Sequence, residues 1–252
     1  MNFEDKFQTL PAQEQKLVVN NTWVSGLLLG AAAVIFAVLF LIASGQDILA
    51  ALGPGGFLPF FADNLLPDNL MESGWWGFVV GPCILMATYC CLEYELRHKL
   101  KSYEADVTEL RQGVTGELIA MPRQKILPAM FFTNFFEEAL FRGTVIPITL
   151  ATLAFVGLTG TPAALIASAV SALTFWWVHA QYRNKYSVIT VLTLGMILAW
   201  IFLWWNSILV CFFAHFLYNL YQLSRERRLA VELDDYYGGK QPLSVLGDLL
   251  KK

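Results

Sequence analysis

The sequence is short of charged residues, which make up 15% of its 252 residues. A typical soluble domain has about 25%, and a chain with so few charges lacks the polar surface that a water-soluble globule or a disordered segment needs. The net charge of −3 provides no basic surface, so no nucleic-acid partner is expected. The four cysteines form no CxxC pair, so neither a zinc ribbon nor a disulfide framework is indicated.

Charge is absent from several long stretches of the sequence, and these stretches are apolar. A bilayer core about 30 Å thick is crossed by roughly 20 apolar helical residues. The runs are continuous rather than alternating, which disfavours a β-barrel. The sequence therefore predicts an all-α fold, a multi-pass transmembrane helical bundle with about six to eight membrane helices. The predicted spans are 22–44, 74–92, 126–157, 162–182, 186–204 and 207–223.

The third predicted span, 126–157, is longer than a bilayer requires. As one straight helix it would reach about 48 Å. We therefore expect that it breaks near Gly143 or Pro147, that it starts outside the bilayer, or that it consists of two helices.

Lysine and arginine are unevenly distributed between the connecting segments. Segment 46–73 has acidic residues but no Lys or Arg, whereas segment 93–125 has six basic residues. By the positive-inside rule, both termini and the basic segments are expected in the cytoplasm. We expect the protein to lie in a bacterial inner membrane, where the lipid bilayer itself is one of its partners.

The same pattern divides the chain into three parts. Residues 1–124 are expected to form a two-span region with an outer loop and a cytoplasmic helical segment. Residues 125–223 form the core, and residues 224–252 form a cytoplasmic tail with a short apolar repeat. The loop 46–73 is rich in proline, glycine and aromatic residues and is interpreted as a connector, with a gate as the alternative.

Ionisable residues inside the predicted spans indicate a functional site. An Asp, Lys or Arg in the bilayer costs about 2.5–3.5 kcal/mol on insertion scales, so such groups face one another or a wet cavity. One such residue alone has a structural explanation, as an ion-paired staple or a hydrogen bond between helices. A purely structural role for all of them together is improbable. The ionisable residues inside the predicted spans are Glu137, Glu138, Arg142, His179 and His215.

Helical spacing separates the roles of the two acids. Residues four apart share a helix face, so Asn134, Glu138 and Arg142 form one stripe and Glu138 can pair with Arg142. Glu137 lies about 100° away around the helix and is left as the spare acid. A spare carboxylate in an apolar cavity suits general acid–base chemistry. By the same spacing, His179 shares a face with Phe175 and His215 shares one with Asn219.

Three short motifs follow one another on these apolar segments. Residues 137–143 read EEALFRG and match EExxxR, residues 175–179 match FxxxH, and residues 215–219 match HxxxN. In this order and on apolar helices, residues 125–223 resemble the CPBP family of intramembrane proteases. This is the CAAX prenyl protease and bacteriocin-processing group, also called Abi.

The resemblance implies an intramembrane endopeptidase that cuts a membrane-associated or lipidated peptide or protein. Glu137 would activate water with help from His179, and His215 and Asn219 would donate hydrogen bonds to the oxyanion. Glu138, Arg142 and Phe175 would support this site structurally and electrostatically. The depths of Glu137, His179 and His215 in the bilayer, counted along the helices from the nearest cytoplasmic Lys or Arg, differ from one another. We expect a cavity in the cytoplasmic half of the bilayer that opens to the cytoplasmic side.

Other functions stay open at the level of sequence. No cofactor is expected, but Glu137, His179 and His215 could form a two-His, one-Glu zinc site, which is the rival mechanism. The chain lacks HExxH. A second class is a catalytically silent membrane scaffold, or an immunity or assembly partner. A third is a small transporter with a proton relay, although no inverted repeat is visible in the sequence.

Overall fold

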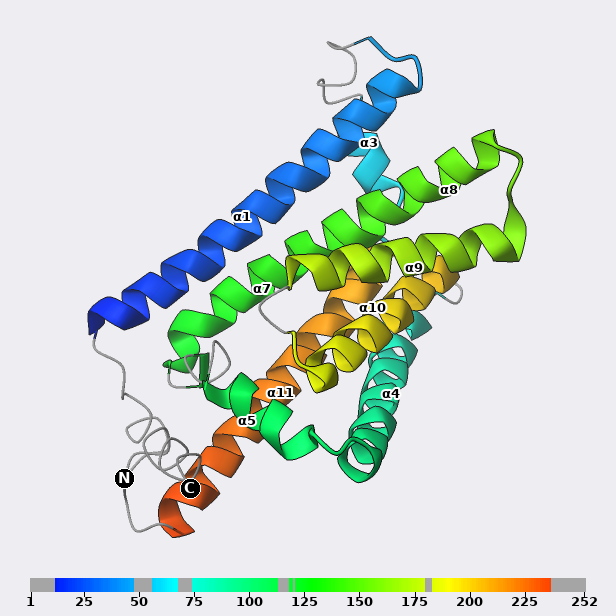
Figure 1. Cartoon of the computed structure of the whole chain (residues 1–252). Coiled ribbons are helices and arrows are strands. Elements are labelled where there is room, and N and C mark those ends of the chain that lie inside the picture. Colours follow the sequence, from blue (N-terminus) through cyan, green and yellow to red (C-terminus); the bar gives the residue numbers. More distant parts are fainter. Residues whose placement is uncertain are drawn as a thin grey trace.

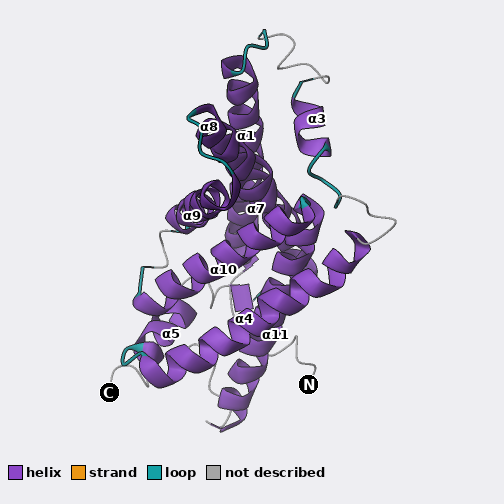
Figure 2. Ribbon diagram, turned by 90° about the vertical axis from the view of Figure 1, so that its right-hand side faces the viewer, coloured by secondary structure: helices purple, strands orange, loops and turns teal. Residues whose placement is uncertain are grey.

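The computed structural model describes residues 12–47, 56–67, 74–112, 118–119, 121–179 and 183–236. Within these ranges every regular element is a helix (Figure 2). The all-α prediction is confirmed. The helices are α1 (Ala12–Ala43), α3 (Phe57–Ala62), η2 (Gly74–Trp76), α4 (Gly77–Lys99), α5 (Tyr103–Gln112), α7 (Arg123–Leu140), η3 (Phe141–Val145), α8 (Ile146–Phe155), α9 (Gly160–Val178), α10 (Lys185–Trp205) and α11 (Ile208–Tyr236).

Five stretches of the described chain are helical, long and apolar enough to cross a membrane. They correspond to the first five predicted spans, and they confirm a multi-pass helical bundle. They are Lys16–Ala43, Gly74–Lys99, Arg123–Phe155, Gly160–Val178 and Lys185–Trp205.

The sixth predicted span, 207–223, lies in α11, which is not among these five. The polar residues His215, Asn219 and Gln222 lower the mean hydropathy of this helix. α1 begins and α11 ends at the same end of the molecule (Figure 1), as an even number of crossings requires. A sixth crossing by α11 therefore stays a prediction.

The α-helical pattern of the long third span is interrupted at Gly143, which is one of the alternatives that the sequence left open. α7 ends at Leu140, the π-helical turn η3 follows, and α8 continues beyond it as part of one long element (Figure 1). A π turn displaces backbone carbonyls from the regular pattern, and side chains here bond two of them. The Phe141 carbonyl accepts from Ser171 Oγ at 2.9 Å, and the Ala139 carbonyl accepts from Thr144 Oγ1 at 2.9 Å.

The fourth predicted span ends earlier than expected. α9 stops at Val178, and His179 is its C-cap with φ −93° and ψ 29°. Nδ1 of His179 bonds to the Phe175 carbonyl at 2.8 Å, which satisfies one carbonyl of the last turn. The charge-free sequence up to Gln181 gave no sign of this stop. α9 ends beside α7 (Figure 1), and His179 Nε2 lies 3.6 Å from Glu137 Oε1 of α7.

The helices pack around one main core. α1 lies along α7, α9 packs between α8 and α10, and α11 packs against α4 and α7 (Figure 1). Leu85, Ile146, Leu198 and Val210 are fully buried where α4, α8, α10 and α11 meet. On the outside, large apolar side chains such as Phe155 are exposed, as expected of a lipid-facing surface.

A short helix, α5, lies at one end of the bundle (Figure 1). The predicted helical segment after the second span is present as the end of α4 and as α5. Asp106 on α5 is buried, and its Oδ2 accepts from the Tyr186 backbone N–H at 3.0 Å. This bond ties α5 to the first turn of α10. The apolar repeat of the predicted tail, 243–250, lies outside the described residues, and the division of the chain into three parts stays a prediction.

Candidate active site

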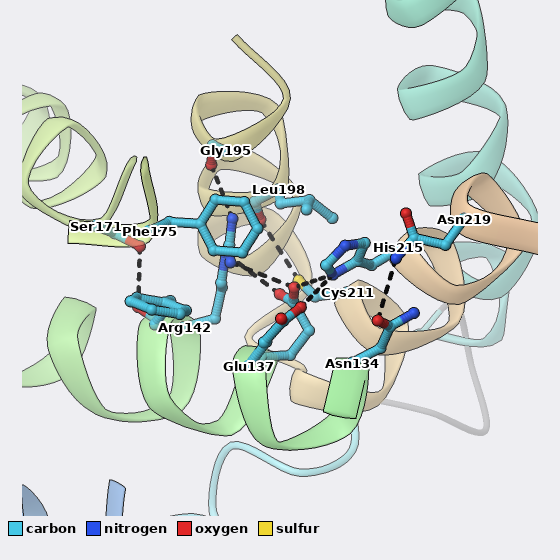
Figure 3. Close-up of polar contacts among 12 residues, drawn as sticks. Asn134, Glu137, Arg142, Ser171, Phe175, Gly195, Leu198, Cys211, His215 and Asn219 are labelled. Atoms are coloured by element: carbon cyan, nitrogen blue, oxygen red, sulfur yellow. Dashed lines mark hydrogen bonds and ion pairs between the residues drawn. The ribbon is translucent and has the colours of Figure 1, made fainter. Parts of the chain in front are cut away.

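The ion pair expected from helical spacing is present and fully buried. Arg142 Nε lies 3.2 Å from Glu138 Oε2, and Arg142 Nη1 donates to Glu138 Oε1 at 3.2 Å. Arg142 Nη2 also donates to the Gly195 carbonyl of α10 at 3.1 Å, and its guanidinium carbon lies 4.8 Å from the Phe175 ring centroid (Figure 3). Arg142 thereby connects α7, α9 and α10 at the level of η3.

His215 of α11 joins this pair. Its Nδ1 lies 2.7 Å from Glu138 Oε1 and 3.8 Å from Glu137 Oε2. Glu138 therefore holds both Arg142 and His215, and its side chain is completely buried. Sequence spacing predicted the first of these contacts but gave no information on the second.

Glu137 faces a cavity, whereas Glu138 does not line it. His179 lies next to Glu137, with 3.6 Å between His179 Nε2 and Glu137 Oε1. His179 Nδ1 is bonded to a backbone carbonyl, so Nδ1 carries the proton and Nε2 is the nitrogen that faces Glu137. Phe175 holds the other side of this imidazole, with 4.4 Å between the ring centroids.

Asn219 lies one turn beyond His215 on α11 and also lines the cavity. Its Nδ2 donates to Asn134 Oδ1 of α7 at 3.1 Å (Figure 3). Asn134 lies on the predicted helix stripe with Glu138, and nothing in the sequence indicated a role for it.

One cavity of about 400 Å³ connects the four residues predicted to be catalytic: Glu137, His179, His215 and Asn219. Leu85, Leu194 and Leu198 form an apolar part of its wall. The cavity also reaches Val107 and Leu110 of α5, at the end of the bundle that carries the basic segment 93–125. This is the side on which the sequence predicted an opening.

A second polar cluster, centred on Glu93, lies on the cavity wall, and the sequence did not predict it. Glu93 accepts from Tyr103 Oη and Tyr186 Oη, each at 2.5 Å, and from Arg225 Nη2 at 3.0 Å. Burial, followed by the hydrogen bond to Glu93, raises the pKa of Tyr103, so this hydroxyl stays protonated and keeps donating. Glu93 directly follows the predicted span 74–92, and that position is the only signal for it in the sequence.

The predicted site residues come together from helices far apart in the sequence. Glu137, Glu138 and Arg142 come from α7 and η3, Phe175 and His179 from the end of α9, and His215 and Asn219 from α11. Among the described residues, no set of three or more His, Cys, Asp or Glu side chains is grouped as a metal ion requires.

Comparison with known proteins agrees with the resemblance inferred from the motifs. Residues 120–221 match the family model Rce1-like, described as type II CAAX prenyl endopeptidase Rce1-like. This segment is less than half of the chain, and it contains all three motifs. No curated protein and no solved structure matches the chain.

The family match confirms the resemblance to the CPBP proteases for this part of the chain. Together with the five apolar helices, it supports an integral membrane protein whose residues 120–221 are similar to CAAX-type intramembrane proteases.

Proposed function

We propose that this protein is a glutamic intramembrane endopeptidase that hydrolyses a peptide bond of a membrane-associated or lipidated peptide. The observation that carries the proposal is the difference between the two neighbouring acids. Glu138 is buried and bonded to Arg142 and His215, whereas Glu137 lines the cavity beside His179.

Glu137 and His179 suit the activation of a water molecule. The 3.6 Å between Glu137 Oε1 and His179 Nε2 exceeds a direct hydrogen bond of about 2.7–3.2 Å. A carboxylate oxygen and an unprotonated Nε2 are both acceptors, so a water molecule can donate one O–H to each. Glu137 takes a proton as the water oxygen attacks the carbonyl carbon of the scissile bond. That proton then passes to the leaving amine, and the acyl carbon keeps the hydroxyl.

His215 and Asn219 are the proposed donors to the oxyanion of the tetrahedral intermediate. Asn219 Nδ2 has two hydrogens, and only one of them is donated to Asn134. His215 Nδ1 is bonded to Glu138, so donation from Nε2 requires the imidazolium, in which both nitrogens donate. Glu138 compensates that positive charge. Donors of this kind are worth about 10²–10³ in kcat each.

The proposal includes the cellular setting inferred from the sequence. The enzyme would lie in a bacterial inner membrane with both termini in the cytoplasm, and would act without a cofactor. Substrate would enter from the end of the bundle at α5, which the cavity reaches.

The first test compares the wild type with Glu137→Gln on a library of membrane-anchored peptides in proteoliposomes, with and without a chelator. Gln keeps the shape of the side chain and removes the base, so cleavage by Glu137→Gln should fall at least about 10²-fold while the thermal unfolding temperature stays near that of the wild type. Cleavage by the wild type should resist the chelator.

The outcomes separate the competing mechanisms. Activity lost on chelation and restored by zinc would favour a site of Glu137, His179 and His215 with a metal ion. Full cleavage by Glu137→Gln would exclude Glu137 as the base. No cleavage by the wild type, together with cellular function retained by Glu137→Gln, would favour a membrane scaffold.

A further inference from the structure

A pair of asparagines links the helix that carries the proposed base to the helix that carries the proposed oxyanion donors. Asn134 lies three residues before Glu137 on α7, on the same face of the helix. Asn219 lies four residues after His215 on α11. Asn219 Nδ2 donates to Asn134 Oδ1 at 3.1 Å across the interface, and both residues line the cavity.

The side chain of Asn134 is unusual for a helix in a membrane protein. It is only 3% exposed, and its Nδ2 has no acceptor among the residues that the structure describes. A buried donor without a partner costs about 1–3 kcal/mol. Such a cost is hard to explain by packing alone, and it is expected where a ligand completes the site.

We propose that Asn134 is a positioning residue of the active site, which fixes the amide of Asn219 in the orientation that donates to the oxyanion. This inference rests on the proposed hydrolytic function. An amide can rotate by 180° and present either its oxygen or its nitrogen. The acceptor oxygen of Asn134 selects the orientation in which Asn219 Nδ2 faces α7. One Nδ2 hydrogen is bonded to Asn134, and the second is held for the substrate.

The same bond fixes α7 relative to α11. Glu137 and Asn134 share one helix, and His215 and Asn219 share the other, so the Asn134–Asn219 bond holds base and donors at a constant separation. Removing it lets the Asn219 amide rotate, whereas the contact of Glu137 with His179 joins α7 to α9 and is not part of this bond. The expected effect is therefore on kcat rather than on KM, because the oxyanion forms only during the reaction.

The experiment is a double-mutant cycle with Asn134→Ala, Asn219→Ala and the double variant, measured on the peptide that the wild type cleaves best. Asn134→Ala should lower kcat about 10–100-fold with KM within about twofold of wild type. In the Asn219→Ala background, adding Asn134→Ala should lower kcat little further. A residue that acts through Asn219 has no further effect once the Asn219 side chain is removed.

Asn134→Asp provides the conservative variant, since it keeps an acceptor oxygen in the same place. It should retain more of the wild-type kcat than Asn134→Ala does. Ser168→Ala is a matched control for the loss of a buried hydrogen-bonding group. Ser168 is fully buried on α9, and its Oγ donates to the Ala164 carbonyl of its own helix. Ser168 is not among the described residues that line the cavity. The kcat of the Ser168→Ala variant should stay near that of the wild type.

The outcomes distinguish this inference from the proposed function. If Glu137→Gln is inactive but Asn134→Ala keeps wild-type kcat, the role of Asn134 is wrong and the protease proposal stands. Multiplicative effects in the cycle would exclude action through Asn219. A wild type that cleaves no peptide while Glu137→Gln retains the cellular function, or a Glu137→Gln variant that cleaves as well as the wild type, would overturn both proposals.

Discussion

At the scale of the residue, two ion pairs of identical spacing lie in opposite environments. Glu138 and Arg142 are four residues apart with both side chains 0% exposed, whereas Glu95 and Lys99 are four apart with side chains 49% and 77% exposed. Water screens the exposed pair, which is worth about 0–1 kcal/mol. The buried pair has no water to replace a missing partner.

This contrast gives a prediction on stability. Arg142→Met keeps much of the side-chain volume but leaves Glu138 buried without its permanent cation, so the free energy of unfolding should fall by about 3–5 kcal/mol. The matched control, Lys99→Met, should change it by less than about 1 kcal/mol. Unfolding by added SDS in mixed micelles measures both. Equal losses in the two variants would contradict the interpretation of the buried pair as a stabilising element.

At the scale of the element, the π turn η3 determines how closely α7 and α8 approach α11. Gly143 lies in η3, and a Cβ built on it would be 2.5 Å from Ile208 Cδ1. Ile208 is the first residue of α11 and is 1% exposed. A side chain at position 143 would therefore push α11 away from the element that carries Glu137 and Arg142.

Gly143→Ala should lower both stability, by about 1–3 kcal/mol, and peptide cleavage. Ile208→Val removes the Cδ1 atom that a side chain at position 143 would meet. Alone, this substitution should lower the free energy of unfolding by about 0.5–1.5 kcal/mol. In the Gly143→Ala background, however, it should restore part of the lost stability. Thermal unfolding of the two single variants and the double variant tests this. Strictly additive losses of stability in the double variant would show that the Ile208 side chain is not what excludes a side chain at position 143.

At the scale of the whole molecule, the helices are arranged so that the basic connections and both ends of the described chain lie together. α5 and the end of α11 lie at the end of the bundle where α1 begins (Figure 1). The acidic connection that contains α3 lies at the other end. This separation follows the positive-inside rule.

The predicted orientation is testable by labelling. Single cysteines at Lys101 and at Asp63, in a cysteine-free background, should react differently with a membrane-impermeant maleimide. In intact spheroplasts only the cysteine at position 63 should react, and in inverted vesicles only the cysteine at position 101. The reverse pattern would contradict cytoplasmic termini, and labelling of both from one side would contradict a membrane crossing by α4.

The sequence by itself determined the class of fold and the placement of the two acids on the third span. Continuous apolar runs require helices in lipid, because backbone groups have no other partners there. The 3.6-residue period places Glu138 beside Arg142 and turns Glu137 to another face, and both predictions hold in the structure. These are local consequences of helix geometry.

Only the tertiary structure decided the contacts between helices. The bond from His215 to Glu138, the end of α9 at Val178 and the Asn134–Asn219 bond depend on how α7, α9 and α11 pack. The hydrogen bonds of Glu93 likewise join α4, α5, α10 and α11. Apolar patterning fixes which residues are helical, but the rotation and depth of each helix depend on side-chain packing with neighbours distant in sequence.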